Sequence, residues 1–287
     1  MNTLLEPFDY EFFRNGLLVA TLAGGLCGLV GVFVVLRGMS YIGHGLSHAI
    51  FGGAVASYVL SVNFYLGAGL WGFVSALLIG GVSRRRSIGA DAAIGVITTA
   101  SFAVGLALIS RYHSFTRNFE AALFGNVLGV TTSDLLVLAA VTAVTVAIIF
   151  LRYRALLFTT FDADVADVFG VRAARADALL ALILASSIIA TMQILGVTLV
   201  AAALVIPAVV ARMLTNSFSR MLFLSSGIGA ASGFVGINLS YHLDISSGAT
   251  VVLVAAAVFV VVFAATGRRR LGRIAQVEGS ASAPIPG

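Results

Sequence analysis

The stretch GMSYIGHGLSHAIFGGAVASYVLSVNFYLGAGLWGFVSALLIGGVS, residues 38–83, decides the fold class, because it contains no Asp, Glu, Lys or Arg. A helix that crosses a bilayer needs about 20 predominantly apolar residues, so this stretch has room for two crossings. The rest of the chain continues the pattern. Of its 287 residues 60% are hydrophobic and 10% are charged, against roughly 25% charged in a soluble domain. The sequence therefore predicts an all-α integral membrane protein.

Apolar runs along the chain predict about nine transmembrane helices. One run, residues 178–211, is too long for one crossing, because at about 1.5 Å per residue it would span about 50 Å against a hydrocarbon core of about 30 Å. Gly196 and Pro207 favour a break within it, so we divide this run in two. Without that division the alternative count is eight. The predicted crossings are residues 15–36, 41–60, 64–82, 91–110, 132–151, 178–195, 198–211, 221–240 and 248–266.

The arginines favour nine crossings over eight. The chain has no Lys, and most of its 17 arginines follow the end of an apolar run. Lys and Arg are enriched in cytoplasmic loops, and nine crossings with the N-terminus outside place these clusters in the cytoplasm. Eight crossings would place Arg212, Arg220 and Arg268–Arg270 outside. Arg111 and Arg117 are exceptions, since nine crossings place them in an outer loop.

The predicted organisation is a single transmembrane domain, residues 15–266, with short flanking segments. Residues 1–14 are expected to form an N-terminal segment on the extracytoplasmic side of the membrane. Residues 267–287 form a cytoplasmic tail that is disordered at its end, and residues 152–177 form the longest charged loop. Cys27 is the single cysteine and lies in the first apolar run, so we expect a small buried thiol and no intrachain disulfide.

His44 and His48 are the only clearly ionisable side chains inside the predicted crossings. An ionisable group within a bilayer is a functional candidate, because burying it there is costly. Residues four apart share one helical face, about 6 Å apart, and His48 lies about 15 Å from the helix start at Gly38, near the bilayer centre. Neutral imidazoles at this spacing can coordinate Zn²⁺, Mn²⁺ or Fe²⁺. Hydrogen bonds to neighbouring helices and a proton-relay pair are alternatives. Side chains on other runs that could add oxygen ligands are Thr98, Thr99, Ser101 and Gln193.

The charged loop contains FDADVADVFGVRAARAD, residues Phe161–Asp177. Asp162 can cap a short helix that Gly170 ends, and acidic residues in its first turns suit the positive end of the helix dipole. A short amphipathic helix of this kind suits docking of a cytoplasmic partner, and an ordinary solvated loop is the alternative. The docking candidates are Asp162, Asp164, Asp167, Val168, Phe169 and Gly170.

Four segments resemble, in order and spacing, the permease family of bacterial zinc, manganese and iron ABC importers. They are RGMSYIGHGLSHAIFGG (Arg37–Gly53), DAAIGVITTASFAVG (Asp91–Gly105), the Phe161–Arg172 loop and LVAAALVIPAVVARML (Leu199–Leu214). The resemblance runs from about residue 12 to residue 266. It implies the fold of type II importers, related to vitamin B12 and siderophore permeases. It also implies a homodimer in the bacterial cytoplasmic (inner) membrane.

The same resemblance implies partners and a cargo. The Phe161–Arg172 loop would hold a coupling helix that sits in a groove of a separate cytoplasmic ATPase subunit, and a solute-binding protein would deliver the metal from outside. The metal would be cargo, with no permanently bound cofactor. The family commonly has Asp where this chain has His44, and that Asp with the His matched by His48 is thought to form the metal site. A His–His pair favours Zn²⁺ or Fe²⁺, whereas RGMS looks like the manganese branch, so the metal stays open.

Two predicted outer loops carry further polar residues. Tyr241, His242 and Asp244 precede the last crossing, and His113 and Glu120 lie in the other outer loop. They could form a metal-access site or a docking surface for the binding protein. A solvated polar loop is the alternative.

Other classes of membrane protein fit the sequence less well. A secondary cation or proton-coupled carrier that uses His44 and His48 would usually carry intramembrane acids, and the predicted crossings hold none outside their ends. An intramembrane enzyme would need a general base such as a nearby Glu. A permease for bulky metal chelates would not need two imidazoles in mid-membrane. The chain has no GxxxxGK[ST] phosphate loop, so we expect a transport subunit and not an ATPase.

Overall fold

The structure is a computed structural model of the chain and describes residues 6–83, 90–112, 125, 127–162, 166 and 170–281. These residues form ten α-helices and two short 3-10 helices and contain no strand, which confirms the predicted all-α class. The α-helices are α1 (Glu11–Leu36), α2 (Ser40–Val59), α3 (Phe64–Ser83), α4 (Ala90–Tyr112), α6 (Thr132–Leu151), α7 (Tyr153–Phe161), α9 (Ala173–Leu195), α10 (Val200–Leu214), α11 (Phe218–Leu243) and α12 (Ser247–Ala281). The 3-10 helices are η1 (Glu6–Asp9) and η2 (Val127–Gly129).

Each predicted crossing coincides with a helix of 15 or more residues in the described part of the chain. Seven of these helices are long and apolar enough to cross a bilayer, with a mean hydropathy of 1.5 to 2.7. The other two are α2, whose 20 residues are rich in Gly, Ser and His, and α10, which has 15 residues. A helix as short as α10 spans about 22 Å, less than a hydrocarbon core of about 30 Å. The crossings of α2 and α10 therefore stay predictions.

The long apolar run divides at Gly196, as its length predicts. The helix α9 ends at Leu195, and Gly196 has a φ of 83°, which glycine adopts without a steric penalty. The Gly196 N–H still donates a hydrogen bond of 2.8 Å to the Met192 carbonyl. Pro207, the other residue expected to interrupt the run, lies inside α10 and does not end it. The turn redirects the chain so that α10 packs against α1 and α11.

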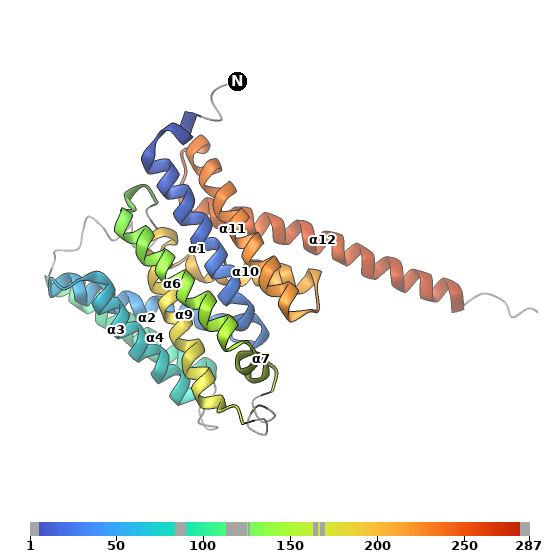
Figure 1. Cartoon of the computed structure of the whole chain (residues 1–287), viewed down its shortest axis with the longest axis horizontal. Coiled ribbons are helices and arrows are strands. Elements are labelled where there is room, and N and C mark those ends of the chain that lie inside the picture. Colours follow the sequence, from blue (N-terminus) through green and yellow to red (C-terminus); the bar gives the residue numbers. More distant parts are fainter. Residues whose placement is uncertain are drawn as a thin grey trace, which may run out of the picture.

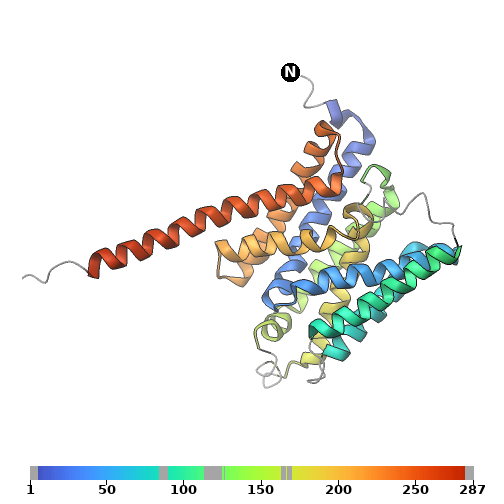
Figure 2. The same cartoon turned by 180° about the vertical axis from the view of Figure 1, so that it is seen from behind.

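Two groups of helices pack on either side of α1 and α9 (Figure 1). In one group α2 contacts both α3 and α4, and α3 packs against α9. In the other group α10 and α11 pack against α1, and α12 packs against α10 and α11. Figures 1 and 2 show α12 projecting far beyond the bundle. It continues to Ala281, past the predicted domain end at residue 266, and residues 282–287 of the expected tail lie outside the described residues.

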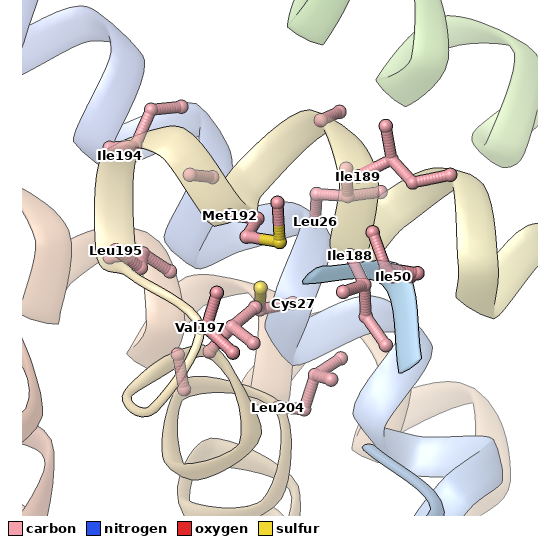
Figure 3. Close-up of a cluster of buried hydrophobic side chains, with 14 of the residues drawn as sticks. Leu26, Cys27, Ile50, Ile188, Ile189, Met192, Ile194, Leu195, Val197 and Leu204 are labelled. Carbon is pink, nitrogen blue, oxygen red and sulfur yellow. The ribbon is translucent and has the colours of Figure 1, made fainter. Parts of the chain in front are cut away.

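The core lies where α1, α2, α9 and α10 meet (Figure 3). Cys27 of α1, Ile188 and Met192 of α9, and Leu204 of α10 are each at most 2% exposed. The Cys27 thiol is free and buried, as predicted, and lies 3.9 Å from the hydroxyl of Thr191. Apolar side chains gain little by leaving lipid for a protein interior, so close fit between helices carries much of the stability here.

The helices α1 and α11 approach each other through small residues. Gly24 packs against Gly229 so closely that a Cβ on either glycine would collide with the backbone carbonyl of the other. One turn further along α1, Gly28 lies against Ser225, whose hydroxyl donates a 2.5 Å hydrogen bond to the Gly28 carbonyl. Small residues four apart are the usual means by which membrane helices bring their backbones together. This glycine contact fixes α11 on α1.

Candidate functional site

His44 and His48 lie on one face of α2 with their rings close together. The ring centroids are 4.5 Å apart and the ring planes are inclined by 79°. Both side chains are half-buried. The His48 ring also packs edge-on against Phe102 of α4, with centroids 5.1 Å apart, and the His44 ring lies 5.7 Å from that of Tyr41. The i, i+4 spacing thus brings the two imidazoles together as predicted.

The Nδ1 atom of His48 is buried and has no hydrogen-bond partner among the described residues. Buried polar atoms in native proteins are nearly always paired, and a buried nitrogen without a partner loses free energy relative to its state in water. The alternative interpretation, in which both histidines form hydrogen bonds with neighbouring helices, therefore fails for Nδ1 of His48 among the described residues. An imidazole nitrogen whose lone pair accepts no hydrogen bond can bind a metal ion.

A glycine on α2 lets α4 approach the histidine face. A Cβ on Gly45 would lie 2.5 Å from Cγ2 of Ile94 and 2.8 Å from Cγ2 of Thr98, so a larger residue at this position would push side chains of α4 aside. Thr98 is buried, and its hydroxyl donates a 2.7 Å hydrogen bond to the Ile94 carbonyl of its own helix. The Ser101 carbonyl packs against Gly52 in the same way. Thr98 and Ser101 therefore lie against α2, whereas Thr99 is exposed.

The histidine pair does not form a closed metal site within one chain. Among the described residues, no group of three or more His, Cys, Asp or Glu side chains could hold a metal ion. Two imidazoles fill at most two of the four or more positions that these metals use in proteins. The other positions would fall to hydroxyl or carbonyl oxygens, to water or to a second chain. An open pair of this kind suits an ion that binds briefly and leaves.

The charged loop is partly described, and its first half forms α7, which the sequence did not predict. Ala166 is fully buried, and its N–H donates a 3.1 Å hydrogen bond to the Asp162 carbonyl. Gly170 has a φ of 74°, and the Val171 N–H bonds back to the Ala166 carbonyl at 3.0 Å. A bond of this kind across a left-handed glycine is common where helices end, and most of the short helix predicted before Gly170 lies outside the described residues. Four of the docking candidates, Asp164, Asp167, Val168 and Phe169, lie outside the described residues.

Arg37 joins the end of α1 to α7 and α9. Its guanidinium forms an ion pair of 2.6 Å with Asp177 of α9. It also donates hydrogen bonds of 2.9 and 3.3 Å to the hydroxyls of Thr159 and Thr160 on α7. The Arg37 side chain is only 10% exposed. From the sequence, Arg37 is interpreted only as a topology signal, and its ion pair with Asp177 is not predicted. The one hint in the sequence is the acidic residue Asp177 at the end of the charged loop.

Breaking this ion pair is expected to loosen the charged loop. Arg37→Gln and Asp177→Asn should each lower stability by about 2 kcal/mol, below the 3–5 kcal/mol of a fully buried pair, because Asp177 is 34% exposed. For a chain of this size that is a fall in Tm of about 4–8 °C, which thermal unfolding in detergent measures. The double variant should lose less than the sum of the two single variants, since they remove one interaction. The ion pair would be contradicted if the stability losses of the two single variants were strictly additive in the double variant. It would also be contradicted if Arg37→Gln lost no more stability than Arg212→Gln, a control that replaces an exposed arginine.

A cavity of about 410 Å³ lies beside the Arg37 cluster. Its walls come from α1, α2, α3, α4, α7 and α9. Ile42 and Ile94 line it, and these residues are close in sequence to His44 and Thr98. Asp162 and Asp177 line it as well. The cavity therefore joins the first turn of α2 to the carboxylates of the charged loop, and neither histidine is among the residues that line it.

The candidate outer residues are only partly brought together. Tyr241 and His242 end α11, and the Tyr241 ring packs against Phe13 of α1 with centroids 5.2 Å apart. Asp244 has a φ of 54° and caps the helix in the left-handed conformation. All three residues are exposed. His113 and Glu120, predicted to join them, lie outside the described residues.

The sequence matches a known family and several curated proteins. The ABC 3 transport family matches residues 9–266. The "Manganese transport system membrane protein MntC" of Halalkalibacterium halodurans is 38% identical over 92% of this chain and 91% of its own length. The "Probable iron transport system membrane protein" of Haemophilus influenzae is 35% identical over 91% of this chain and 96% of its own.

Two solved structures resemble this chain. PsaBC from Streptococcus pneumoniae, solved in complex with Fab, superposes with a TM-score of 0.82 at 33% identity, over 91% of this chain and 95% of the matched chain. An inward-facing ABC transporter of metal-chelate type superposes with a TM-score of 0.70 at 17% identity, over 87% and 84% of the two chains. At that lower identity the second likeness concerns the fold alone.

Proposed function

The chain belongs to the ABC 3 transport family, and from this premise we propose that it is the membrane-spanning permease subunit of an ABC importer for a divalent transition metal. It is a transport subunit, and ATP is hydrolysed by a separate ATPase subunit. The metal is cargo that moves into the cytoplasm, and the chain holds no permanent cofactor. Two observations support this proposal: the family match over residues 9–266 and the pair of imidazoles on one face of α2.

The observation that carries the metal site is the buried, unpaired Nδ1 of His48 beside the ring of His44. We infer that a passing ion accepts this lone pair and one from His44. The hydroxyl-bearing helix α4 lies against the same face through Gly45 and Thr98, and its oxygen atoms are candidates for the remaining positions. Two protein ligands hold the ion loosely enough for release, as transport requires.

The cavity beside Arg37 supports a route from the histidines to the cytoplasm. It is lined by Ile42, two residues before His44 in the sequence of α2, and by the loop carboxylates Asp162 and Asp177. Carboxylates attract a divalent cation, and Asp162 lies near the expected cytoplasmic exit, whereas the charge of Asp177 is balanced by Arg37. In this proposal the ion leaves the pair through this cavity when the helices move.

The partners follow from the same proposal. The loop that ends at Gly170 docks on a dimeric cytoplasmic ATPase, and Arg37 transmits its movement to α1. Two copies of the chain form the permease in the bacterial inner membrane, with the N-terminus outside and the C-terminus in the cytoplasm. An external metal-binding receptor docks near Tyr241, His242 and Asp244, which are all exposed.

The names of the relatives guide the choice of metal. The two curated relatives described above are named for manganese and iron. Zinc is favoured only by the chemistry of a His–His pair, since imidazole suits Zn²⁺ and Fe²⁺ better than Mn²⁺. We therefore rank Mn²⁺ and Fe²⁺ ahead of Zn²⁺ as the cargo.

The function is tested by metal accumulation in cells that lack their own importers. The chain is co-expressed with its ATPase and receptor, and cellular Mn, Fe and Zn are measured by mass spectrometry. We expect one metal to rise, and the rise to disappear when the ATPase is omitted or carries an inactivated ATP site. Accumulation without the ATPase would replace this proposal with a secondary carrier. A complete system that raises no metal would remove the transport proposal altogether.

A further inference from the structure

A second cavity, of about 710 Å³, lies at the junction of α6, α7 and α9 and is separate from the histidine pair. Arg152, Arg172 and Arg175 line it, and all three are exposed. Among the described residues none of them forms an ion pair, and none of the residues lining the cavity is acidic. Three arginines thus line one hollow whose described lining holds no carboxylate, which favours an anionic ligand.

The other wall of this cavity is apolar and continues onto the outer surface of α6. Ile148, Leu151 and Leu179 line the hollow. Leu151 is 83% exposed and its neighbour Phe150 is 66% exposed, at the end of a helix that is apolar enough to cross a bilayer. A small soluble anion has no apolar part that could contact this wall. A ligand with a charged head and a hydrocarbon body would contact both walls.

We propose that this cavity binds the phosphodiester head group of an anionic phospholipid, with the start of its acyl chains along α6. Arg is the side chain best suited to the task, because its planar guanidinium binds phosphate oxygens in pairs and is weakly hydrated. Basic pockets between membrane helices on the cytoplasmic side are known to bind such head groups. The arginine distribution places this end of α6 on that side.

Bound lipid would also act on the charged loop. Gly170 and Val171 line the same cavity, and they form the turn that ends the predicted coupling helix. A head group held by Arg172 and Arg175 therefore fixes the last turn before α9. In this way the lipid stabilises the loop in the position from which it meets a cytoplasmic partner.

The test is retention of lipid by the purified full-length chain, measured by native mass spectrometry after transfer from mixed vesicles. The vesicles contain phosphatidylglycerol and phosphatidylethanolamine in equal amounts, and glycerol phosphate serves as a soluble competitor. The variant Arg172→Gln/Arg175→Gln removes two charges, and Arg172→Lys/Arg175→Lys keeps them. The matched control is Arg212→Gln/Arg220→Gln, which removes two exposed arginines elsewhere on the same predicted side.

We expect wild type and control to retain phosphatidylglycerol over phosphatidylethanolamine, and the Gln variant to lose about tenfold or more of this preference. The Lys variant should keep part of it, and glycerol phosphate should compete weakly. Equal retention by the Gln variant would overturn the proposal. Full competition by glycerol phosphate would overturn it in favour of a soluble phosphate. Unchanged lipid retention with loss of ATPase binding would overturn it in favour of a protein interface.

Discussion

His48→Asn is expected to reduce metal accumulation by the complete transporter at least about tenfold, because it removes one of two imidazoles from the path of the ion. Asn keeps a polar atom near the position of Nδ1, although it loses the edge-on ring contact with Phe102. Its amide oxygen is a weaker ligand for a transition metal than an imidazole nitrogen. The measurement is cellular metal content at equal membrane expression of the variant and wild type.

The matched variant is His44→Asp, which restores the residue that the resemblance associates with this position. A carboxylate is a harder ligand than imidazole, so we expect transport to continue with a preference shifted towards Mn²⁺. Loss in His48→Asn together with activity in His44→Asp identifies a ligand pair. If His48→Asn accumulates metal as well as wild type does, His48 is a packing residue on α2, and the ion passes elsewhere.

Gly24→Ala is expected to be strongly destabilising, because its Cβ would collide with the backbone of Gly229. A backbone carbonyl cannot rotate away from the clash as a side chain can, so α1 and α11 must move apart. We expect a loss of about 3 kcal/mol, or a fall in Tm of about 6–12 °C for a chain of this size. Size-exclusion chromatography of heated samples, with detection of the folded peak, measures this fall.

The control for this prediction is Gly227→Ala on α11. A Cβ at Gly227 meets nothing within 4 Å, so the substitution adds helix propensity without a clash. Its Tm should be equal to or slightly above that of wild type. Equal stability of Gly24→Ala and Gly227→Ala would show that the two helices are not held by the glycine contact.

The helices and the break between α9 and α10 could be predicted from the sequence because both follow from local properties. Run length and hydropathy locate the helices, and the length of residues 178–211 requires a turn at the only glycine within it. The left-handed turn at Gly170 follows from the local preference of glycine in the same way. The pairing of His44 with His48 was equally predictable, since it depends only on the rise and twist of one helix.

Contacts between distant segments could not be predicted in this way. Arg37 and Asp177 are separated in the sequence by five α-helices of the described chain, and the hydrophobic periodicity around either residue gives no indication of the other. The match of Gly24 to Gly229 depends equally on how α1 and α11 pack. The helix α7 was missed because its nine residues are too few for a clear period within a charged loop.

The contact between α1 and α11 can form only late in the synthesis of this protein, after α11 has been made. Gly24 and Gly229 are more than two thirds of the chain apart, and a ribosome adds about 5–20 residues per second, so α1 is made about 10–40 s before its partner exists. During that interval the small-residue face of α1 is covered by lipid or by the insertion machinery. A message that stops before residue 218 yields an α1 without its partner helix, so the small-residue face of α1 stays uncovered by α11.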